Sequence, residues 1–459
     1  MNPLPADLLQ ALSDLFGADA LLTDPAECLV YGYDNSRRQG QAAAVVLPTT
    51  TTQVQELVRL CRRHRIALVA RGRGTNTTGA SVPPDGAIVV SFERMNRLLA
   101  IRPGDRVAVV EPGLLNGELQ TALAAHGLFW PADPTSAAYS TIGGNLACNA
   151  GGPRTVKYGA ARDNLLAVTA VDGRGELLTL GAAVTKSASG FDLARLLVGS
   201  EGTLALIVEA TLRLTPLPAE RRALRALYRD EASAAAAVAR LMAQPVTPSM
   251  LEFMDGQCVR LARDVGKADL PDAGAALMIE ADGETAALPA AVAALCKAAD
   301  GDGCLGVTAA ASEAEREQLW AARKALSPSL RSLAPGKINE DVVVPVSRIP
   351  ELVSATQRIA AAESLPIVCF GHAGNGNLHV NILYDPADAD QSKRAERALD
   401  AVFDAVIALE GQVSGEHGVG LAKRELLARA LPGETLILMH AIKKVFDPDG
   451  ILNPGKVLA

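Results

Sequence analysis

The chain has few aromatic residues, no closely spaced cysteines and no long uncharged apolar run. Aromatic side chains make up only 3% of its 459 residues. The seven cysteines are scattered without a Cys-x-x-Cys pair, which excludes the usual iron–sulfur spacings and indicates reduced, mostly buried thiols. No segment approaches the roughly 18 uncharged apolar residues of a membrane span. The sequence therefore predicts a globular protein without a membrane span.

Basic residues are also too few and too dispersed for a nucleic-acid-binding groove. The formal net charge is −7, and there is no dense basic run. The N-terminus is amphipathic and acidic, without the basic start and apolar run of a secretory signal. We therefore expect a cytoplasmic protein, and peripheral attachment to the inner membrane is left open. Its length favours about three domain-sized units.

The N-terminal part reads as a helix followed by a β-α-β unit. Residues 1–40 predict one helix and a lead-in, and residues 44–48 a short strand. Thr52 and Gln55 form a capping-box pattern before a helix with apolar residues at helical spacing. Residues 66–70 are a continuous apolar run of the buried-strand kind. This strand leads directly into a loop rich in glycine and threonine.

The loop at residues 71–81, RGRGTNTTGAS, offers many free backbone amides. Successive N–H groups in such a turn make an anion nest suited to phosphate. The glycines at 72, 74 and 79 do not fit the dinucleotide fingerprint, and Pro83 and Pro84 follow where its helix should start. No Gly-Lys-Ser/Thr follows, which excludes a P-loop. A surface loop without a ligand is the alternative.

A rigid turn that bears hydroxyl groups and three stretches that contain glycine follow in the same half of the chain. They are WPADPTS at 130–136, IGGNLACNAGG at 142–152, KYG at 157–159, and GSEGTL at 199–204, which leads into a predicted strand at 205–214. Such glycine density lets the backbone approach a flat ligand closely, and asparagine offers both a donor and an acceptor. Several such loops in one stretch are hard to explain as turns alone.

Together these motifs resemble the FAD-binding domain of the vanillyl-alcohol oxidase / p-cresol methylhydroxylase (PCMH) superfamily over roughly residues 40–220. The resemblance implies a dissociable FAD, since the loop has no histidine for a covalent link. Asn76 stands where similar loops often have glycine, and we expect it to tolerate a positive φ. The implied FAD contacts are Arg71, Gly72, Arg73, Gly74, Thr75, Asn76, Thr77, Thr78, Pro134, Thr135, Ser136, Gly143, Gly144, Asn145, Asn149, Gly151, Gly152, Tyr158, Glu201, Gly202, Ile207 and Asn453.

The C-terminal half alternates helices and strands. Helices are predicted at 232–243 and 284–300, and strands at 276–281, 304–309 and 342–345. LEFMD at 251–255 reads as a strand end whose carboxylates are structural or line a cavity. Ser312 and Glu315 form a capping box. In the following helix, Arg323 lies within an apolar stripe, either covering it with its stem or binding a substrate carboxylate.

Two short stretches, GHAGNGNLHVN at 371–381 and SGEHG at 414–418, hold three of the six histidines. The alternation after Asn377 predicts a half-buried strand that points His379 and Asn381 towards a cavity, and the glycine-rich turn can fold His372 back beside His379. Neighbouring side chains tend to point apart, so Glu416 and His417 are expected to have different roles. The working assignment puts His372, His379 and Glu416 on one metal ion and leaves His417 as a base. A turn histidine and an exposed loop pair are the alternatives.

This half resembles the C-terminal domain of FAD-linked oxidases, through LEFMD, LWAARKAL, INEDVVVP, GHAGNGNLHVN, SGEHGVG and DPDGILNPGKVL. The resemblance implies an α+β chain: a PCMH-type FAD-binding domain at 1–216, and an α/β substrate and metal domain at 217–459 whose C-terminal segment returns towards the FAD domain. It supports the metal set and the base, and assigns Arg323, His372, His379 and Asn377 to substrate binding. Zinc is the first choice of metal, with iron or manganese as alternatives.

The implied reaction is the oxidation of a D-2-hydroxy acid such as D-lactate to the 2-oxo acid, with D-2-hydroxyglutarate and glycolate as the alternative substrates. The expected partners are this small molecule and an electron acceptor (a quinone, a cytochrome or an electron-transfer flavoprotein). A homodimer is left open. The competing interpretations are a metallohydrolase without flavin, a true oxidase that uses oxygen, and a flavin-binding subunit without catalysis of its own.

Overall fold

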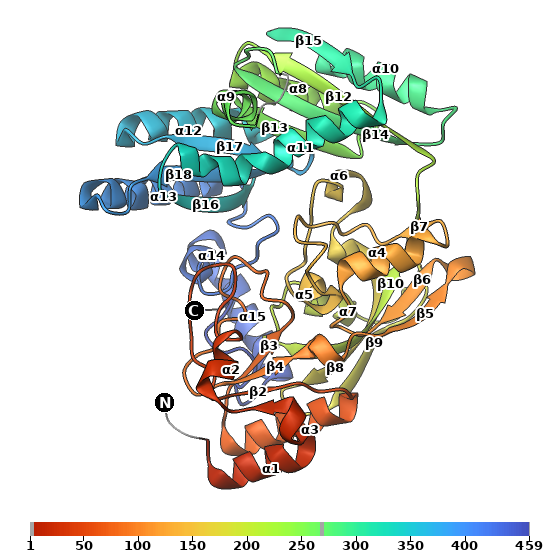
Figure 1. The fold of residues 1–459 in the computed structure, drawn as a ribbon, viewed down its shortest axis with the longest axis vertical. Helices are drawn as coiled ribbons and strands as arrows, with labels where there is room; N and C mark the ends of the chain where they lie inside the picture. The colour runs from red at the N-terminus through yellow and green to blue at the C-terminus, as the bar shows by residue number, and fades with distance from the viewer. Residues whose placement is uncertain (1–3, 267–269, 459) are drawn as a thin grey trace. The chain divides into compact units, whose positions relative to one another are not determined.

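The computed structural model describes residues 4–266 and 270–458, and its contacts divide the chain into two units (Figure 1). The first unit comprises Met1–Gly152, Gly159–Leu217 and Glu416–Ala459; the second comprises Pro153–Tyr158 and Pro218–Gly415. The expected domain boundary, between residues 216 and 217, lies one residue before the observed boundary between Leu217 and Pro218. The units are nevertheless not two continuous domains, because each takes a segment from the other part of the sequence.

The first unit contains two larger sheets and a two-stranded one. The four-stranded sheet has the order β1-β2-β4-β3, the five-stranded sheet β5-β6-β10-β8-β9, and the small one β11-β7. The strands are β1 (Leu21–Leu22), β2 (Ala44–Val46), β3 (Leu68–Arg71), β4 (Ile88–Ser91), β5 (Leu98–Arg102), β6 (Val107–Val110), β7 (Leu128–Phe129), β8 (Leu165–Asp172), β9 (Leu177–Gly181), β10 (Ala205–Arg213) and β11 (Thr215–Pro216).

The expected β-α-β unit is present as β2, helix α3 (Thr51–His64) and β3, with β4 pairing in parallel between the two strands. Helix α1 (Ala6–Phe16) and α3 share a buried cluster with these strands. The predicted cap is wrong: Thr50, not Thr52, caps α3, and its hydroxyl accepts from the Gln53 backbone N–H at 3.2 Å. Thr52 lies inside the helix because the threonine run 49–52 offers the same chemistry at several positions.

The C-terminal segment belongs to the first unit because its backbone pairs with β3. Leu68 donates its N–H to the Ile451 carbonyl at 2.8 Å, and the Asn453 N–H donates to the Leu68 carbonyl at 2.7 Å. The Thr78 carbonyl similarly accepts from the N–H groups of Leu421 and Ala422. Residues far apart in the sequence therefore complete the edge from which the glycine-rich loop leaves.

The remaining described helices of the first unit surround the second sheet and the chain ends. They are α2 (Pro25–Leu29), α4 (Asn116–Ala124), α5 (Ile142–Ala147), α7 (Leu193–Leu197), α14 (Arg424–Ala430) and α15 (Gly433–Phe446). Residues of α4, α5 and α7 share a buried cluster with the five-stranded sheet and with Phe446 of α15.

The second unit is built on one seven-stranded sheet with the order β15-β12-β14-β13-β17-β18-β16, in which the neighbouring strands are antiparallel. Its strands are β12 (Glu220–Tyr228), β13 (Met250–Asp255), β14 (Ala275–Gly283), β15 (Cys304–Ala309), β16 (Gly336–Val343), β17 (Ile367–Gly371) and β18 (Asn377–Tyr384). Strand β16 begins six residues before the predicted strand at 342–345.

The helices of this unit are α6 (Thr155–Tyr158), α8 (Glu231–Ala243), α9 (Gly256–Asp264), α10 (Leu288–Ala299), α11 (Glu313–Ser329), α12 (Ile349–Glu363) and α13 (Ala389–Ala408). The predicted cap of α11 is confirmed, since the Ser312 hydroxyl accepts from the Glu315 N–H at 3.2 Å. Helices α9 and α11 share a buried cluster with Met254, Met278 and Phe370 of the sheet.

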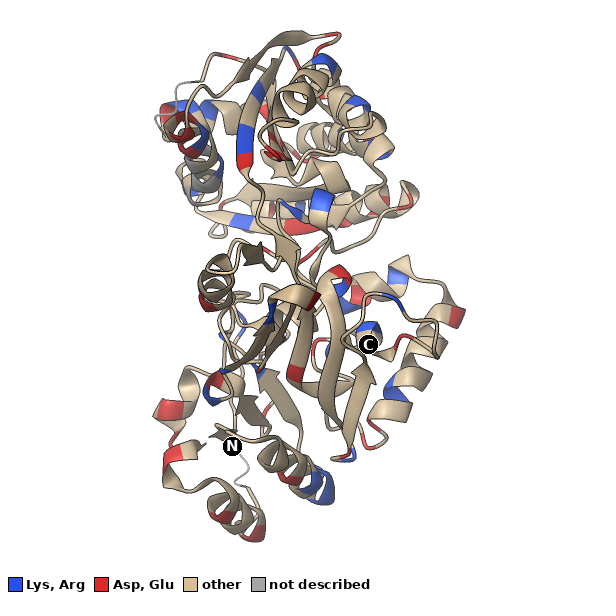
Figure 2. Ribbon diagram, turned by 90° about the vertical axis from the view of Figure 1, so that its right-hand side faces the viewer, with Lys and Arg blue, Asp and Glu red and all other residues tan. Residues whose placement is uncertain are grey.

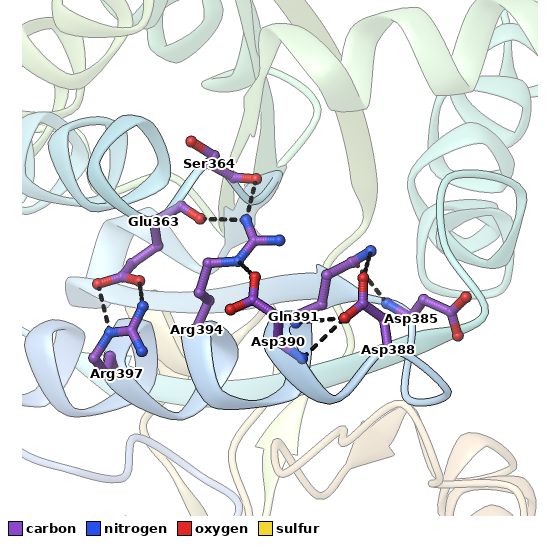
Figure 3. Close-up of polar contacts among 8 residues, drawn as sticks. All are labelled: Glu363, Ser364, Asp385, Asp388, Asp390, Gln391, Arg394 and Arg397. Carbon is purple, nitrogen blue, oxygen red and sulfur yellow. Dashed lines mark hydrogen bonds and ion pairs between the residues drawn. The ribbon is translucent and has the colours of Figure 1, made fainter.

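Helices α12 and α13 are fastened to each other by polar contacts at the end of α12 (Figure 3). Arg394 donates to the carbonyl oxygens of Glu363 and Ser364 at 2.8 and 3.2 Å, and Arg397 pairs with the Glu363 carboxylate at 2.7 Å. Arg394 thereby compensates unsatisfied carbonyl groups at the C-terminus of α12. The Asp388 carboxylate caps the start of α13.

Strand β18 shows the predicted alternation, but it is not half-buried. Leu378, Val380 and Ile382 are fully buried, and His379 and Asn381 on the other face are also at most 8% exposed. The second face is covered because α9 and α11 pack on the sheet there. A histidine in such a place must have polar partners, since an unpaired buried polar group costs free energy.

No helix in the described residues has the length and apolar character needed to cross a membrane. Figure 2 shows acidic and basic residues interspersed along the helices and loops of each unit.

Candidate functional site

The glycine-rich loops of the first unit enclose a cavity of about 360 Å³. Of the predicted FAD contacts, the described lining contains Arg71, Gly72, Arg73, Gly74, Thr75, Asn76, Thr77, Pro134, Thr135, Ser136, Gly143, Gly144, Asn145, Gly151, Glu201, Gly202 and Ile207. The described lining does not contain Thr78, Asn149, Gly152, Tyr158 or Asn453. It also contains residues that the sequence analysis missed, among them Pro112, Thr141 and Ser200, which lie next to predicted positions in space or in sequence.

Two polar atoms in this lining indicate that the cavity suits a polar ligand. Within the described part of the chain, the Asn145 Nδ2 and Thr77 Oγ1 atoms are buried and have no hydrogen-bond partner. A buried unsatisfied donor costs about 1–3 kcal/mol. A ligand with oxygen acceptors, such as the phosphates and ribityl hydroxyls of FAD, would remove that cost.

Gly143 marks a close approach in the cavity wall. A Cβ added there would lie 2.6 Å from the Cβ and 2.9 Å from the carbonyl oxygen of Pro112. Gly143→Ala is therefore expected to shift the start of α5 and to weaken FAD binding about tenfold, since overpacking costs about 1–3 kcal/mol. The measurement is FAD titration of the apoprotein.

Gly104→Ala is the matched control, because a Cβ at Gly104 meets nothing within 4 Å and its φ is not in the positive range. We expect this variant to bind FAD as the unmodified protein does. Equal FAD affinity in the Gly143 and Gly104 variants would contradict the assignment of Gly143 to the FAD wall.

Asn76 was expected to tolerate a positive φ, but the structure does not require this of it. It is not among the residues with positive φ. Its Oδ1 instead accepts from the backbone N–H groups of Thr78 and Ala80 at 2.8 and 3.1 Å, and its Nδ2 donates to the His417 carbonyl at 3.0 Å. The asparagine is therefore used for its side-chain hydrogen bonds, which hold the loop and the backbone of residue 417 together.

Arg71 has a structural contact that the sequence analysis did not foresee. Its guanidinium is 7% exposed and donates to the carbonyl oxygens of Tyr33 and Val30 at 2.7 and 3.1 Å. It thereby holds the segment before β2 against the start of the loop. Arg71 still lines the cavity together with Gly72 and Gly74.

Glu201 lies in the cavity wall and connects to the C-terminal segment. Its carboxylate accepts from the N–H groups of Val419 and Gly420 at 2.6 and 2.8 Å. Burial raises the pKa of Glu201 to about 7, against the lowering effect of these bonds and of Lys456. The Asn453 Nδ2 donates to the Glu201 and Ala80 carbonyls at 2.7 and 2.8 Å. Glu201 thus holds residues 419 and 420, which closely follow His417, beside the loops.

Glu416 and His417 belong to the first unit and line the same cavity as the glycine-rich loops. Both are partly exposed. The His417 carbonyl accepts from the Asn76 side chain, which holds this residue at the cavity wall. The two neighbours of the SGEHG stretch therefore both border the space expected for FAD.

In the second unit, His372 and His379 come together as the glycine-rich turn predicted. His372 follows β17 and His379 lies in β18; their ring centroids are 5.3 Å apart at an angle of 84°. Their candidate ligand nitrogens lie within 4.8 Å of one another. Imidazole nitrogens at this separation suit two ligands of one cation, which fits the expected metal chemistry.

Asn377 stands at the start of β18 and connects this turn to the SGEHG stretch. Its Nδ2 donates to the Asp341 Oδ1 and to the Val342 carbonyl at 2.6 and 2.8 Å. The other Asp341 oxygen accepts from the Ser414 hydroxyl and the Gly415 N–H at 3.1 and 2.9 Å. Because Glu416 follows Gly415 directly, these bonds fix the point at which the chain enters Glu416.

Glu252 of β13 is the main residue that the sequence analysis did not single out. Its carboxylate, 1% exposed, bonds His372 Nδ1 and Arg323. Burial would raise the pKa of Glu252, but the charges of His372 and Arg323 outweigh it and lower the pKa to about 2. An acidic residue within the apolar run LEFM was the available signal, since a buried carboxylate requires charged partners.

Arg323 reaches the sheet from α11, as its place in the apolar stripe allowed. Its Nε and Nη2 atoms lie 2.8 and 2.7 Å from the same Glu252 oxygen, and its guanidinium stacks 4.5 Å from the Phe370 ring centroid. The edge formed by Nε and Nη2 is thus engaged by Glu252. A substrate carboxylate would meet the remaining Nη1 side of the guanidinium.

Tyr158 is part of the second unit, with Lys157. Its hydroxyl donates to Asp282 Oδ2 at 2.8 Å, and Lys157 pairs with the other oxygen of the same carboxylate. The resemblance to the FAD-binding domain implied that Tyr158 contacts FAD, and this stays a prediction. The segment 153–158 packs on β13 and β14.

Comparison with known families covers most of the chain. Residues 42–181 match the family described as "FAD binding domain", and residues 217–457 match "FAD linked oxidases, C-terminal domain".

Among curated proteins, the chain is 38% identical to the glycolate oxidase subunit GlcD of Bacillus subtilis (strain 168), over 99% of this chain and 97% of that protein. It is 34% identical to D-2-hydroxyglutarate dehydrogenase of Stutzerimonas stutzeri (strain A1501), over 98% and 99% respectively. It is 33% identical to D-lactate dehydrogenase of Anaerostipes hadrus, over 93% and 92%.

Among solved structures, p-cresol methylhydroxylase with substrate bound matches with a TM-score of 0.80 at 17% identity, over 98% of this chain and 96% of that one. Alkyldihydroxyacetonephosphate synthase matches with a TM-score of 0.77 at 19% identity, over 99% and 87%. At this identity the likeness shows the fold, and it confirms the predicted fold class. The chain belongs to the family of FAD-linked oxidases and is an FAD-dependent oxidoreductase of the group that includes glycolate oxidase subunits and the D-lactate and D-2-hydroxyglutarate dehydrogenases.

Proposed function

We propose that this oxidoreductase dehydrogenates a D-2-hydroxy acid of the D-lactate type to the corresponding 2-oxo acid. The observation that carries the proposal is the pair His372 and His379, whose ligand nitrogens lie within 4.8 Å in the unit that follows the FAD-binding domain. D-2-Hydroxyglutarate and glycolate are the alternative substrates, since relatives named for them match nearly the whole chain.

The proposed metal ligands are His372, His379 and Glu416. The contact between Asp341 and Gly415 supports Glu416, because it fixes the residue directly before it. Two histidines and a carboxylate suit zinc, and Fe²⁺ or Mn²⁺ accept the same set. Such a cation, when bound, holds the carboxylate and hydroxyl of a 2-hydroxy acid and lowers the pKa of that hydroxyl.

His417 is the proposed base that takes the proton of the substrate hydroxyl. A bound FAD would supply the acceptor for the C2 hydrogen, which would leave as a hydride, so that loss of the proton and the hydride together would yield the 2-oxo acid. Arg323 and Asn377 are proposed to orient the substrate, Arg323 through the Nη1 side of its guanidinium. Their contacts to Glu252 and Asp341 support this role by holding both side chains in one conformation.

The reduced flavin requires an electron acceptor, for which we propose a quinone, a cytochrome or an electron-transfer flavoprotein. Substrate-dependent formation of hydrogen peroxide, at the rate seen with an artificial acceptor, would instead identify a true oxidase.

The function is tested by anaerobic bleaching of the flavin absorbance with both enantiomers of lactate and 2-hydroxyglutarate and with glycolate. We expect at least one D-2-hydroxy acid to bleach the flavin within seconds and its L-enantiomer to leave it oxidised. A yellow protein excludes the metallohydrolase. A flavin that none of these acids reduces would contradict the proposed substrate class and favour a subunit without its own catalysis.

A further inference from the structure

Glu252 lies in β13, and His372 directly follows β17, the neighbouring strand of the seven-stranded sheet. Strand β13 pairs with β17 through Phe253 opposite Gly371, so the residues directly outside this pair, Glu252 and His372, face each other. The two positions are 120 residues apart in the sequence. Strand pairing therefore brings a buried carboxylate against a proposed metal ligand.

The two oxygens of Glu252 have different partners. Oε1 bonds His372 Nδ1, and Oε2 accepts from Nε and Nη2 of Arg323 at 2.8 and 2.7 Å. An ionised carboxylate has no hydrogen to donate, so in the bond with His372 the ring donates the Nδ1 hydrogen to Glu252 Oε1. In the neutral ring, that arrangement puts the nitrogen lone pair on Nε2.

We propose that Glu252 is a positioning residue that selects the Nδ1–H tautomer of His372, presents its Nε2 to the divalent cation, and holds Arg323 of α11 at the same time. The inference deepens the proposed function and rests on its metal site. A carboxylate behind a metal-bound histidine orients the ring and raises its basicity, and the loss of such a partner typically costs 10–100-fold in metal affinity.

The same carboxylate joins two proposed substrate-site residues that come from different elements. His372 follows β17, and Arg323 projects from α11. Because each takes a separate oxygen, one side chain sets both positions. Glu252 is thus expected to influence the cation affinity and the position of the arginine together.

Glu280 of β14 provides a matched control within the same unit. It is 0% exposed and also binds α11, accepting from Arg316 Nη1 at 3.2 Å and from Trp320 Nε1 at 3.1 Å. Its other partner is the Ser249 hydroxyl at 3.5 Å, and in the described part of the chain it bonds no histidine. Glu280→Gln therefore removes a buried charge and weakens the attachment of α11 without altering the partner of His372.

The experiment compares the unmodified protein, Glu252→Gln and Glu280→Gln, each loaded with FAD and freed of metal. Zn²⁺ is titrated in competition with a chromophoric chelator. We expect the dissociation constant to rise about 10–100-fold in Glu252→Gln and to stay within about twofold in Glu280→Gln. Equal affinity in all three proteins, or an equal loss in both variants, would overturn the role of Glu252.

A second measurement keeps the inference separate from the metal proposal. The ¹⁵N chemical shifts of the His372 ring in the metal-free protein, recorded at a pH where the ring is neutral, report its tautomer directly. We expect Nδ1–H in the unmodified protein and in Glu280→Gln, and a mixture in Glu252→Gln. An Nε2–H ring in the unmodified protein would refute the inference, whereas Nδ1–H without Zn²⁺ uptake would refute the proposed metal site only.

Folding is checked by the flavin absorbance and by the melting temperature of each metal-free protein. If Glu252→Gln does not fold, Glu252→Asp replaces it, since the shorter carboxylate keeps the charge. We expect this variant to fold and to recover the Nδ1–H tautomer in part. Full Zn²⁺ affinity with the other tautomer would again overturn the proposal.

Discussion

The His417→Ala variant is expected to reduce its bound flavin with a D-2-hydroxy acid about 10²–10⁴-fold more slowly than the unmodified protein, which is the usual contribution of a general base. FAD should stay bound, because the contact of residue 417 with Asn76 uses the backbone carbonyl, which alanine keeps. Metal content should also be retained, because His417 is not a proposed ligand.

The measurement is stopped-flow bleaching under anaerobic conditions, with metal analysis of the same samples. His440→Ala is the control, since His440 is an exposed histidine of α15 outside the proposed site. Loss of metal in His417→Ala would mean that the roles of Glu416 and His417 are exchanged. Unchanged reduction would remove His417 as the base.

Removal of the cation is expected to lower turnover by about 10²–10³-fold, because stabilisation of developing charge by a metal ion is worth several kcal/mol and each 1.4 kcal/mol is a factor of ten. The flavin absorbance should remain, since the FAD loops contain no proposed ligand. Turnover with an artificial acceptor is measured before chelation, after it, and after Zn²⁺, Mn²⁺ or Fe²⁺ is returned.

His372→Ala and His379→Ala should behave as the chelated protein does and should not regain turnover at Zn²⁺ concentrations that restore the unmodified protein. A chelated protein that keeps full turnover would show that the reaction needs no metal. In that case, His372 and His379 would bind substrate directly.

Short-range patterns in the sequence predicted much of what lies in this structure. The Ser312 cap, the alternation of β18 and the glycine-rich loop after β3 depend on residues within a few positions of one another. The prediction of a close pair of histidines followed the same logic, because a tight turn between two strands returns the chain on itself. The error at Thr50 arose where neighbouring residues are chemically equivalent.

The roles of Asn76, Arg71 and Tyr158 could not be read from their motifs. Each motif supplies a loop that approaches a ligand, but the direction of a side chain depends on what packs beside it. Asn76 meets the backbone of residue 417, which lies 341 residues further along the chain. Tyr158 meets Asp282 of a distant strand.

The sequence by itself determined the class of this protein. The features that did so are the glycine-rich loops for FAD and the histidines of GHAGNGNLHVN and SGEHG. These features are local, so they survive without knowledge of the fold. Only the tertiary structure decided that Glu252 stands behind His372 and that Glu201 holds residues 419 and 420. Both are buried carboxylates whose partners come from strand pairing or from the returning C-terminal segment, and neither contact is encoded in the spacing of nearby residues.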